Sequence, residues 1–425
     1  MYQNAAILAA FLLIYSAVAG RIERSWLSGP IVFTAGGLLL GPYGLGVVRL
    51  NLGAEGLRTL AELTLAMVLF TDAANADFDV VRRHIGVPER LRLIGLPLTI
   101  VFGFLAAMVL FPGIAPLEMA LLAAMLAPTD AALGKPVVTN PTVPAVLREA
   151  LNLESGLNDG ICVPIVVLLL GLAVETQIEH ATMIHAIRVV VEELGIGALV
   201  GVALTWLTTL MLRFAERQGW ISEHWEEVPI VALAAACFAA AQAAGGSGFI
   251  ACFVGGLLLS GLRQGHKEKL LRGAVATGEA LALLTWIAFG IGALAPIVAR
   301  LTWPALLYAL LSLTVIRMGP VFLCLAGTGM RAVDKLFIAW FGPRGLATIV
   351  FGVIVLNEKL PGNDTIIAVA GGTVLLSVVT HGVTANPLVK ATMGRSSEES
   401  QAVNRLVGRR RLRAQTNDHT VGPEA

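Results

Sequence analysis

Two carboxylates stand at the start of a long apolar stretch in this sequence. Glu154 and Asp159 lie in the segment LNLESGLNDG (151–160), which runs directly into ICVPIVVLLL (161–170). An ionisable group at membrane depth costs about 2.5 to 3.5 kcal/mol on insertion scales, so such groups are rarely placed there without a use. Ser155 and Asn158 complete the pattern, because spacings of four residues put all four side chains on one face of a helix.

A further carboxylate, Asp130, lies upstream in LAPTDA (126–131), beside the helix-breaking Pro128. A hard cation prefers oxygen ligands, and Asp159, Asp130, Ser155, Thr129 and the freed carbonyls of a broken helix would supply them. Burial disfavours the charged form of a carboxylate, and a second carboxylate nearby disfavours it further. Such a site would release a proton near neutral pH and then accept a cation, so the two ligands compete.

The composition indicates that this chemistry belongs in a membrane. Hydrophobic residues make up 56% of the chain and charged residues 14%, with a mean hydropathy of +0.78. Soluble domains are nearer 45 to 50% apolar and about 25% charged. The four cysteines lie inside apolar stretches without paired spacing. They are therefore expected to be small buried hydrophobes, not disulfides or metal ligands.

Apolar runs near twenty residues predict an all-α polytopic membrane protein with about thirteen transmembrane helices. The first span is expected to be a retained helix, because residues 1–5 carry no side-chain cation and a signal peptide needs a positive start. The expected limits are 4–20, 28–47, 59–76, 92–112, 115–134, 143–173, 186–212, 227–244, 247–262, 273–299, 302–325, 333–356 and 365–388.

Most loop lysines and arginines follow odd-numbered spans, among them Arg82, Arg83, Lys267 and Lys269. The positive-inside rule then places the N-terminus outside and the C-terminus in the cytoplasm of a multi-pass protein of the cell (inner) membrane. Residues 1–393 would form the transmembrane domain. Residues 394–425 are polar, include the run RRRLR (409–413), and are expected to be a disordered cytoplasmic tail.

The spans also suggest an internal repeat. If the seventh span is a linker, spans 1–6 and 8–13 form two six-helix halves of opposite orientation. The fifth span is broken at PTD (128–130) and the twelfth at GPRG (342–345). Broken helices at matching places of two inverted repeats point to a transporter site. Asp130 and Arg344 could neutralise the dipoles of the helix ends at these breaks.

Four motifs in these spans carry a family resemblance: PTD (128–130), ESGLND (154–159), GPRG (342–345) and LSVVTHGVT (376–384). In this order they resemble the NhaP/NHE-type sodium–proton antiporters of the monovalent cation–proton antiporter superfamily. The resemblance implies an NhaA-like fold with broken crossing helices, and an antiporter domain in which core and dimerisation subdomains are interleaved. It also implies a homodimer in the lipid bilayer that works by elevator-like alternating access. No cofactor is expected beyond the transported Na⁺ and H⁺, and no enzymatic activity or nucleic-acid partner.

Residue by residue, the resemblance makes Asp159 the carboxylate that binds either the cation or a proton. Asp130, Thr129 and Ser155 would add oxygen ligands for Na⁺. Asn158 stands where electrogenic relatives have an aspartate, which implies electroneutral exchange.

Other residues match the family's supporting positions. Glu154 would form a structural ion pair with Arg317 in the eleventh span, and Arg344 matches the arginine of the broken twelfth span. Asp72, in LFTD (69–72), sits where some members carry an acidic residue near the ion path. The sequence departs from the family pattern at Pro343 and Gly156, where apolar residues are more usual, and this leaves the ion preference open.

Structural interpretations remain beside these roles. Asp130 could be a cap on a broken helix, and Arg344 either a balancing charge or a direct participant. For Glu154 and Arg317 the structural interpretation is preferred, and His381 is expected to be a hydrogen-bonded packing histidine.

A K⁺/H⁺ antiporter of the same fold and a sodium-coupled solute symporter stay as alternatives. An intramembrane aspartyl protease is disfavoured because Asp159 lacks the Gly-x-Gly-Asp context of such enzymes.

Overall fold

The computed structural model describes residues 2–22, 27–49, 54–75, 86–138, 140, 142–177, 183–222, 225–262, 267–358 and 360–418, and regular structure within these ranges is entirely helical. The first helices are α1 (Tyr2–Ile22), α2 (Gly29–Leu40), α3 (Ala54–Asn75), α5 (Val87–Arg90), the π-helical η1 (Leu91–Gly95), α6 (Leu96–Leu110), α7 (Pro116–Met125), α8 (Ala131–Val138), α9 (Ala145–Glu175) and α10 (Met183–Arg217). Those that follow are α11 (Val228–Ala243), α12 (Gly248–Leu262), α13 (Lys267–Ala288), the π-helical η3 (Phe289–Ala293), α14 (Leu294–Arg300), α15 (Trp303–Leu313), α16 (Val315–Cys324), α17 (Ala332–Trp340), α18 (Leu346–Glu358) and α19 (Asn363–Asp418).

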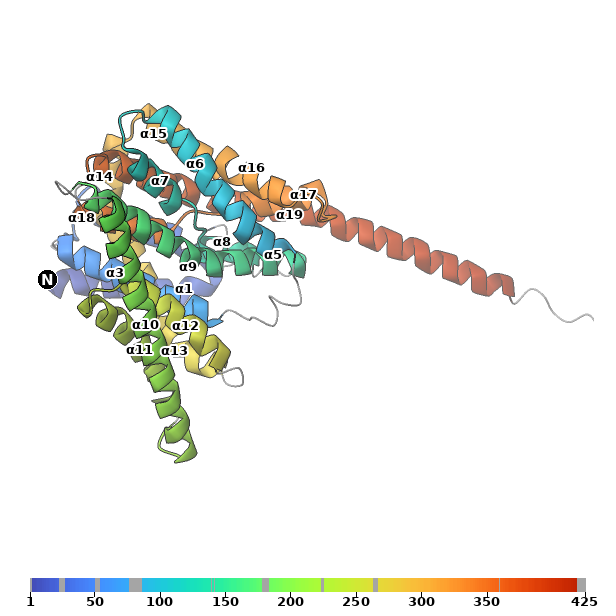
Figure 1. Ribbon diagram of the computed structural model, residues 1–425. Coiled ribbons are helices and arrows are strands. Elements are labelled where there is room, and N and C mark those ends of the chain that lie inside the picture. The colour runs from blue at the N-terminus through green and yellow to red at the C-terminus, as the bar shows by residue number, and fades with distance from the viewer. Residues whose placement is uncertain are drawn as a thin grey trace, which may run out of the picture.

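The described helices pack together into a bundle (Figure 1). Seven helical stretches are long and apolar enough to cross a membrane, and five shorter apolar helices accompany them. A span of hydrocarbon needs about 20 residues of helix, so several crossings are built from two helices that follow one another along the chain. The all-α polytopic fold class is confirmed, while the count of thirteen crossings and the inverted repeat stay predictions.

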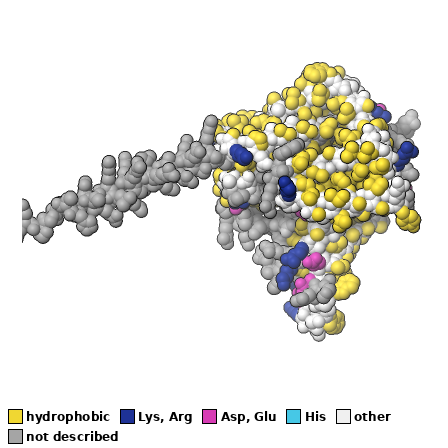
Figure 2. Space-filling view, turned by 180° about the vertical axis from the view of Figure 1, so that it is seen from behind, with side chains coloured by type: hydrophobic (Ala, Val, Ile, Leu, Met, Phe, Trp, Pro, Cys, Tyr) yellow, Lys and Arg dark blue, Asp and Glu magenta, His cyan; other side chains and the backbone are white. Residues whose placement is uncertain are grey.

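Close helix packing in the bundle depends on small residues, as expected where both sides of an interface are apolar. Gly256 of α12 lies against α3, where an added Cβ would approach the Cβ of Ala73 to 2.9 Å. The face shown in Figure 2 is largely hydrophobic, with few charged side chains over the body of the bundle. Such a surface fits contact with lipid, because soluble monomers rarely expose large continuous apolar areas.

The C-terminal segment is helical as far as Asp418, and the disorder of a cytoplasmic tail at residues 394–425 stays a prediction. Helix α19 continues without interruption to Asp418 and leaves the bundle as a single long helix (Figure 1). Residues 394–418 contain no proline, and extending an existing helix avoids the unfavourable nucleation step that an isolated helix must overcome. The division between a transmembrane domain and a tail at residue 393 stays a prediction.

Candidate functional site

Two interrupted helices meet at the centre of the site. α7 ends at Met125 and α8 begins at Ala131, while α17 ends at Trp340 and α18 begins at Leu346. Both breaks lie where the sequence predicts them. They are joined directly, because the backbone N–H of Asp130 donates to the carbonyl of Pro343 at 2.8 Å. The breaks therefore form one unit although they are distant in sequence.

The carboxylate of Asp130 serves both half-helices that follow the breaks. Its Oδ1 accepts the N–H of Leu133 at 3.1 Å in α8, and its Oδ2 accepts the N–H of Leu346 at 2.6 Å at the start of α18. A carboxylate at a helix N-terminus satisfies free amides and offsets the positive end of the helix dipole. A Cβ on Gly345 would collide with this carboxylate. Asp130 therefore caps both half-helices, which is the structural role that the sequence also suggested for it.

Arg344, in the break before α18, contacts the backbone at the C-terminal end of α7. Its side chain is fully buried, and Nη1 donates to the carbonyls of Ala127 and Pro128, the latter at 2.9 Å. Thr348 adds a hydrogen bond to the carbonyl of Met125 at 3.0 Å. A positive charge is favourable where a helix ends in unpaired carbonyls. This geometry fits the expectation that Arg344 balances the broken helix.

The predicted hydroxyl ligands are brought together beside Asp159. Thr129 Oγ1 and Ser155 Oγ lie 3.0 Å apart, and the amide of Asn158 donates to Thr129 Oγ1 at 3.4 Å. Asp159, on the same face of α9, has an exposed fraction of 8%. Its Oδ1 makes no hydrogen bond with the described part of the chain. Ser155, Asn158 and Asp159 thus share one face of α9, as their spacing predicts, and Thr129 joins them from the break between α7 and α8.

Three carboxylates share this region. Asp159 interacts electrostatically with Asp130 and with Asp72, which reaches the site from α3. Within the described residues, no three side chains among His, Cys, Asp and Glu gather as metal ligands. A cation here would therefore need hydroxyl and backbone oxygens together with carboxylates, as hard cations accept.

The predicted ion pair lies beneath the second break. Arg317 of α16 donates to Glu154 through two bonds, Nη1 to Oε1 at 2.5 Å and Nη2 to Oε2 at 2.8 Å. Each side chain has an exposed fraction of 1%. A Cβ on Gly342 would lie 2.7 Å from Arg317 Cζ, so the absence of a side chain there lets the guanidinium pack against the break.

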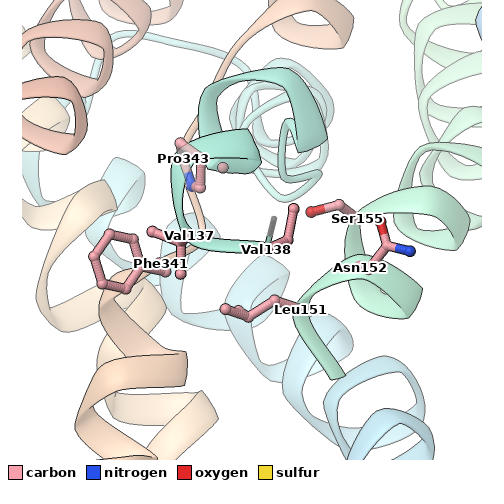
Figure 3. Close-up of a pocket in the computed structure, with 8 residues that line it drawn as sticks. Val137, Val138, Leu151, Asn152, Ser155, Phe341 and Pro343 are labelled. Atoms are coloured by element: carbon pink, nitrogen blue, oxygen red, sulfur yellow. The ribbon is translucent and has the colours of Figure 1, made fainter. Parts of the chain in front are cut away.

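A small cavity lies between α8, α9 and the break before α18 (Figure 3). Its volume is about 10 Å³, roughly that of one water-sized sphere. Asn152, which is not among the predicted site residues, lines the cavity one turn before Ser155. The spacing of three residues on α9 is the sequence signal that would have found it. The lining residues are Gly134, Val137, Val138, Leu151, Asn152, Ser155, Phe341 and Pro343.

Comparison with known proteins agrees with this geometry. The family model described as "Sodium/hydrogen exchanger, transmembrane" matches residues 7–391. The K(+)/H(+) antiporter NhaP of Alkalimonas amylolytica is 25% identical over 393 residues, covering 91% of this chain and 67% of that protein. The K(+)/H(+) antiporter NhaP2 of Shewanella sp. strain ANA-3 is 24% identical over 386 residues, covering 89% and 64%. This chain thus spans about two thirds of the length of these relatives.

Among solved structures, the sodium proton antiporter MjNhaP1 from Methanocaldococcus jannaschii has a similar fold. The TM-score is 0.70 at 21% identity, and the match covers 89% of this chain and 98% of that one. The fold and the family model together confirm the resemblance predicted from the four motifs. They also agree with a multi-pass membrane protein that needs no cofactor. The chain therefore belongs to the sodium/hydrogen exchanger family, whose members are membrane transporters and not enzymes.

Proposed function

We propose that this protein exchanges a monovalent cation for a proton, with Asp159 binding one or the other. The observation that carries the proposal is the buried Asp159 side chain, whose Oδ1 makes no hydrogen bond within the described chain. A buried charge is strongly unfavourable unless it is paired, neutralised or bound to a metal ion. A proton and a cation are alternative ways to meet that need, and their exclusion of each other couples the two fluxes.

The surrounding groups would complete the coordination of the cation. Thr129 and Ser155 offer hydroxyl oxygens, and Asp130 offers a carboxylate that also accepts the backbone amides of Leu133 and Leu346. Asp72 adds a third carboxyl group near Asp130, from α3. Since Asn158 carries no charge, one proton would be traded for one cation, and the cycle would be electroneutral.

Sodium is the proposed cation. Potassium is the second candidate, because the curated relatives from Alkalimonas and Shewanella are named K(+)/H(+) antiporters. The two ions use the same ligand types, so the choice rests on cavity size and ligand number. Exchange by such a protein would support control of cellular pH and sodium.

The orientation and assembly complete the proposal. With the N-terminus outside and the C-terminus in the cytoplasm of the cell membrane, α9 begins on the cytoplasmic side. The cavity beside Asn152 and Ser155 would then lie on the cytoplasmic side of the ion site. A homodimer in the bilayer is part of the proposal, and the exposed apolar helices α1 and α10 are available for its interface.

Exchange in reconstituted vesicles tests this function. A pH dye inside the vesicles would report proton movement when Na⁺, K⁺ or Li⁺ is added outside. Asp159→Asn should abolish exchange, because a neutral amide cannot carry the proton or balance the cation. Asp364→Asn is the matched control, since that carboxylate is paired with Arg300 and 85% exposed. Exchange at the wild-type rate by well-inserted Asp159→Asn protein would overturn the assignment.

A further inference from the structure

Three polar side chains on one face of α19 lie against the break between α17 and α18. Ser377, His381 and Thr384 are spaced by four and three residues, the spacing of neighbours on a helix surface. All three belong to the LSVVTHGVT segment, and the ion site described above uses none of them for binding. Their partners are Trp340, the last residue of α17, and Arg344 within the break.

A continuous chain of hydrogen bonds joins the two sides of the break through α19. The backbone N–H of Arg344 donates to Ser377 Oγ at 2.7 Å, and Ser377 Oγ lies 3.2 Å from His381 Nδ1. His381 Nε2 lies 2.9 Å from the carbonyl of Trp340. Because a carbonyl can only accept, Nε2 carries the proton. His381 Nδ1 also lies 3.0 Å from the carbonyl oxygen of Ser377, so both polar groups of that residue contact the ring.

The side chain of Trp340 is held by the same face of α19. Its indole N–H donates to Thr384 Oγ1 at 3.0 Å, and its ring stacks on the imidazole of His381 with centroids 5.2 Å apart. His381 is almost completely buried. The end of α17 is therefore fixed through its backbone and through its side chain.

The backbone of the break between α17 and α18, which these bonds hold, also contacts the residues of the ion site. The carbonyl of Pro343 accepts the backbone N–H of Asp130, and the N–H of Leu346 donates to the Asp130 carboxylate. The side chain of Arg344 donates to the carbonyl of Pro128. A shift of the break would thus move Asp130 and, with it, the neighbouring Thr129. Since hydrogen-bond geometry at such sites must be held within fractions of an ångström, the support is part of the function.

We propose that Ser377, His381 and Thr384 form a clamp that sets the position of the α17–α18 break and thereby the affinity of the site for its cation. This inference rests on the proposed function and adds positioning residues to it. It differs from proton transfer by His381, because both ring nitrogens are already engaged with fixed partners.

Replacing His381 separates hydrogen bonding from packing. His381→Leu removes both bonds, whereas His381→Gln keeps one donor and one acceptor on the side chain. We expect the Leu variant to raise the KM for Na⁺ about tenfold, or about 1.4 kcal/mol. The maximal rate should fall less, and the Gln variant should stay near the wild type. Thr373→Val is the matched control, because that buried hydroxyl donates to Val369 of its own helix.

Hydrogen–deuterium exchange of the purified protein provides a readout that does not need transport. The amides of residues 341, 342 and 344–346 should exchange about tenfold faster in the Leu variant, by the same conversion, while those of α13 stay unchanged. Where the Leu variant fails to fold, Ser377→Ala should show both effects. Unchanged exchange at residues 341, 342 and 344–346, or a Gln variant as impaired as the Leu variant, would overturn the clamp. An inactive wild type with faster amide exchange in the Leu variant would instead contradict the proposed function alone.

Discussion

The ion pair of Glu154 and Arg317 offers the sharpest test of how the site is supported. Glu154→Gln and Arg317→Met each leave the partner charge in place without its counter-ion. The two bonds of 2.5 and 2.8 Å join side chains that are each 1% exposed, so solvent screens them little. Breaking a buried pair in this way costs about 3 to 5 kcal/mol. Two unit charges about 4 Å apart attract by about 4 kcal/mol at an effective dielectric constant near 20, which agrees with that range.

The double variant distinguishes a lost attraction from general damage. With both charges removed, no unpaired charge remains, and most of the single-variant loss should be recovered, because buried pairs seldom add net stability over apolar replacements. The interaction energy from the cycle should then be several kcal/mol, far above the error of additivity. Glu192→Gln is the matched control, since its pair with Arg188 is exposed and contributes less than about 1 kcal/mol.

The measurement is thermal and denaturant unfolding of the purified protein in detergent, with exchange activity recorded in parallel. We expect both single variants to melt well below the wild type and the double variant to melt close to it. Single variants that melt like the wild type would show that the ion pair does not contribute to the free energy of unfolding. A double variant that loses the sum of the single effects would show that the two side chains act separately.

Further predictions concern the break and the charge balance. Gly345→Ala should abolish exchange and lower the melting temperature, because its Cβ would collide with the Asp130 carboxylate; Gly352→Ala, where a Cβ meets open space, should change neither. Electroneutral exchange predicts a steady-state pH gradient that ignores an imposed membrane potential, although one charge crossing 100 mV is worth about 2.3 kcal/mol. Valinomycin can set the potential if K⁺ is not transported. Asn158→Asp should make the gradient depend on voltage, and an unchanged response in that variant would remove Asn158 from the charge balance.

The local part of the site could be predicted from the sequence. Helical spacing grouped Glu154, Ser155, Asn158 and Asp159, because a helix fixes which side chains share a face. The breaks were visible as well, since Pro128 and Pro343 interrupt apolar runs and a proline removes a backbone donor. These features depend on residues within a few positions of one another, which is the range over which sequence patterns are informative.

The supporting bonds could not be predicted, because they join distant segments. The partner of the Asp130 cap is the amide of Leu346, which lies 216 residues away. No local pattern reveals which backbone amide a side chain will meet across a bundle. The spacing of Ser377, His381 and Thr384 was likewise visible in the sequence. The contact of His381 with the carbonyl of Trp340 was not, because it joins two different helices.

The long separations within the site also govern how the protein is made. Arg317 follows Glu154 by 163 residues, and at about 5 to 20 residues per second its synthesis lags by roughly 10 to 30 seconds. During that interval the nascent first half carries its acidic groups through insertion without their basic partners. A carboxyl left alone in hydrocarbon binds a proton instead of staying charged. The charge pattern of the mature site is therefore established only when the last helices join the bundle, and chains cut short before Arg317 should be recognised as incomplete by membrane quality control.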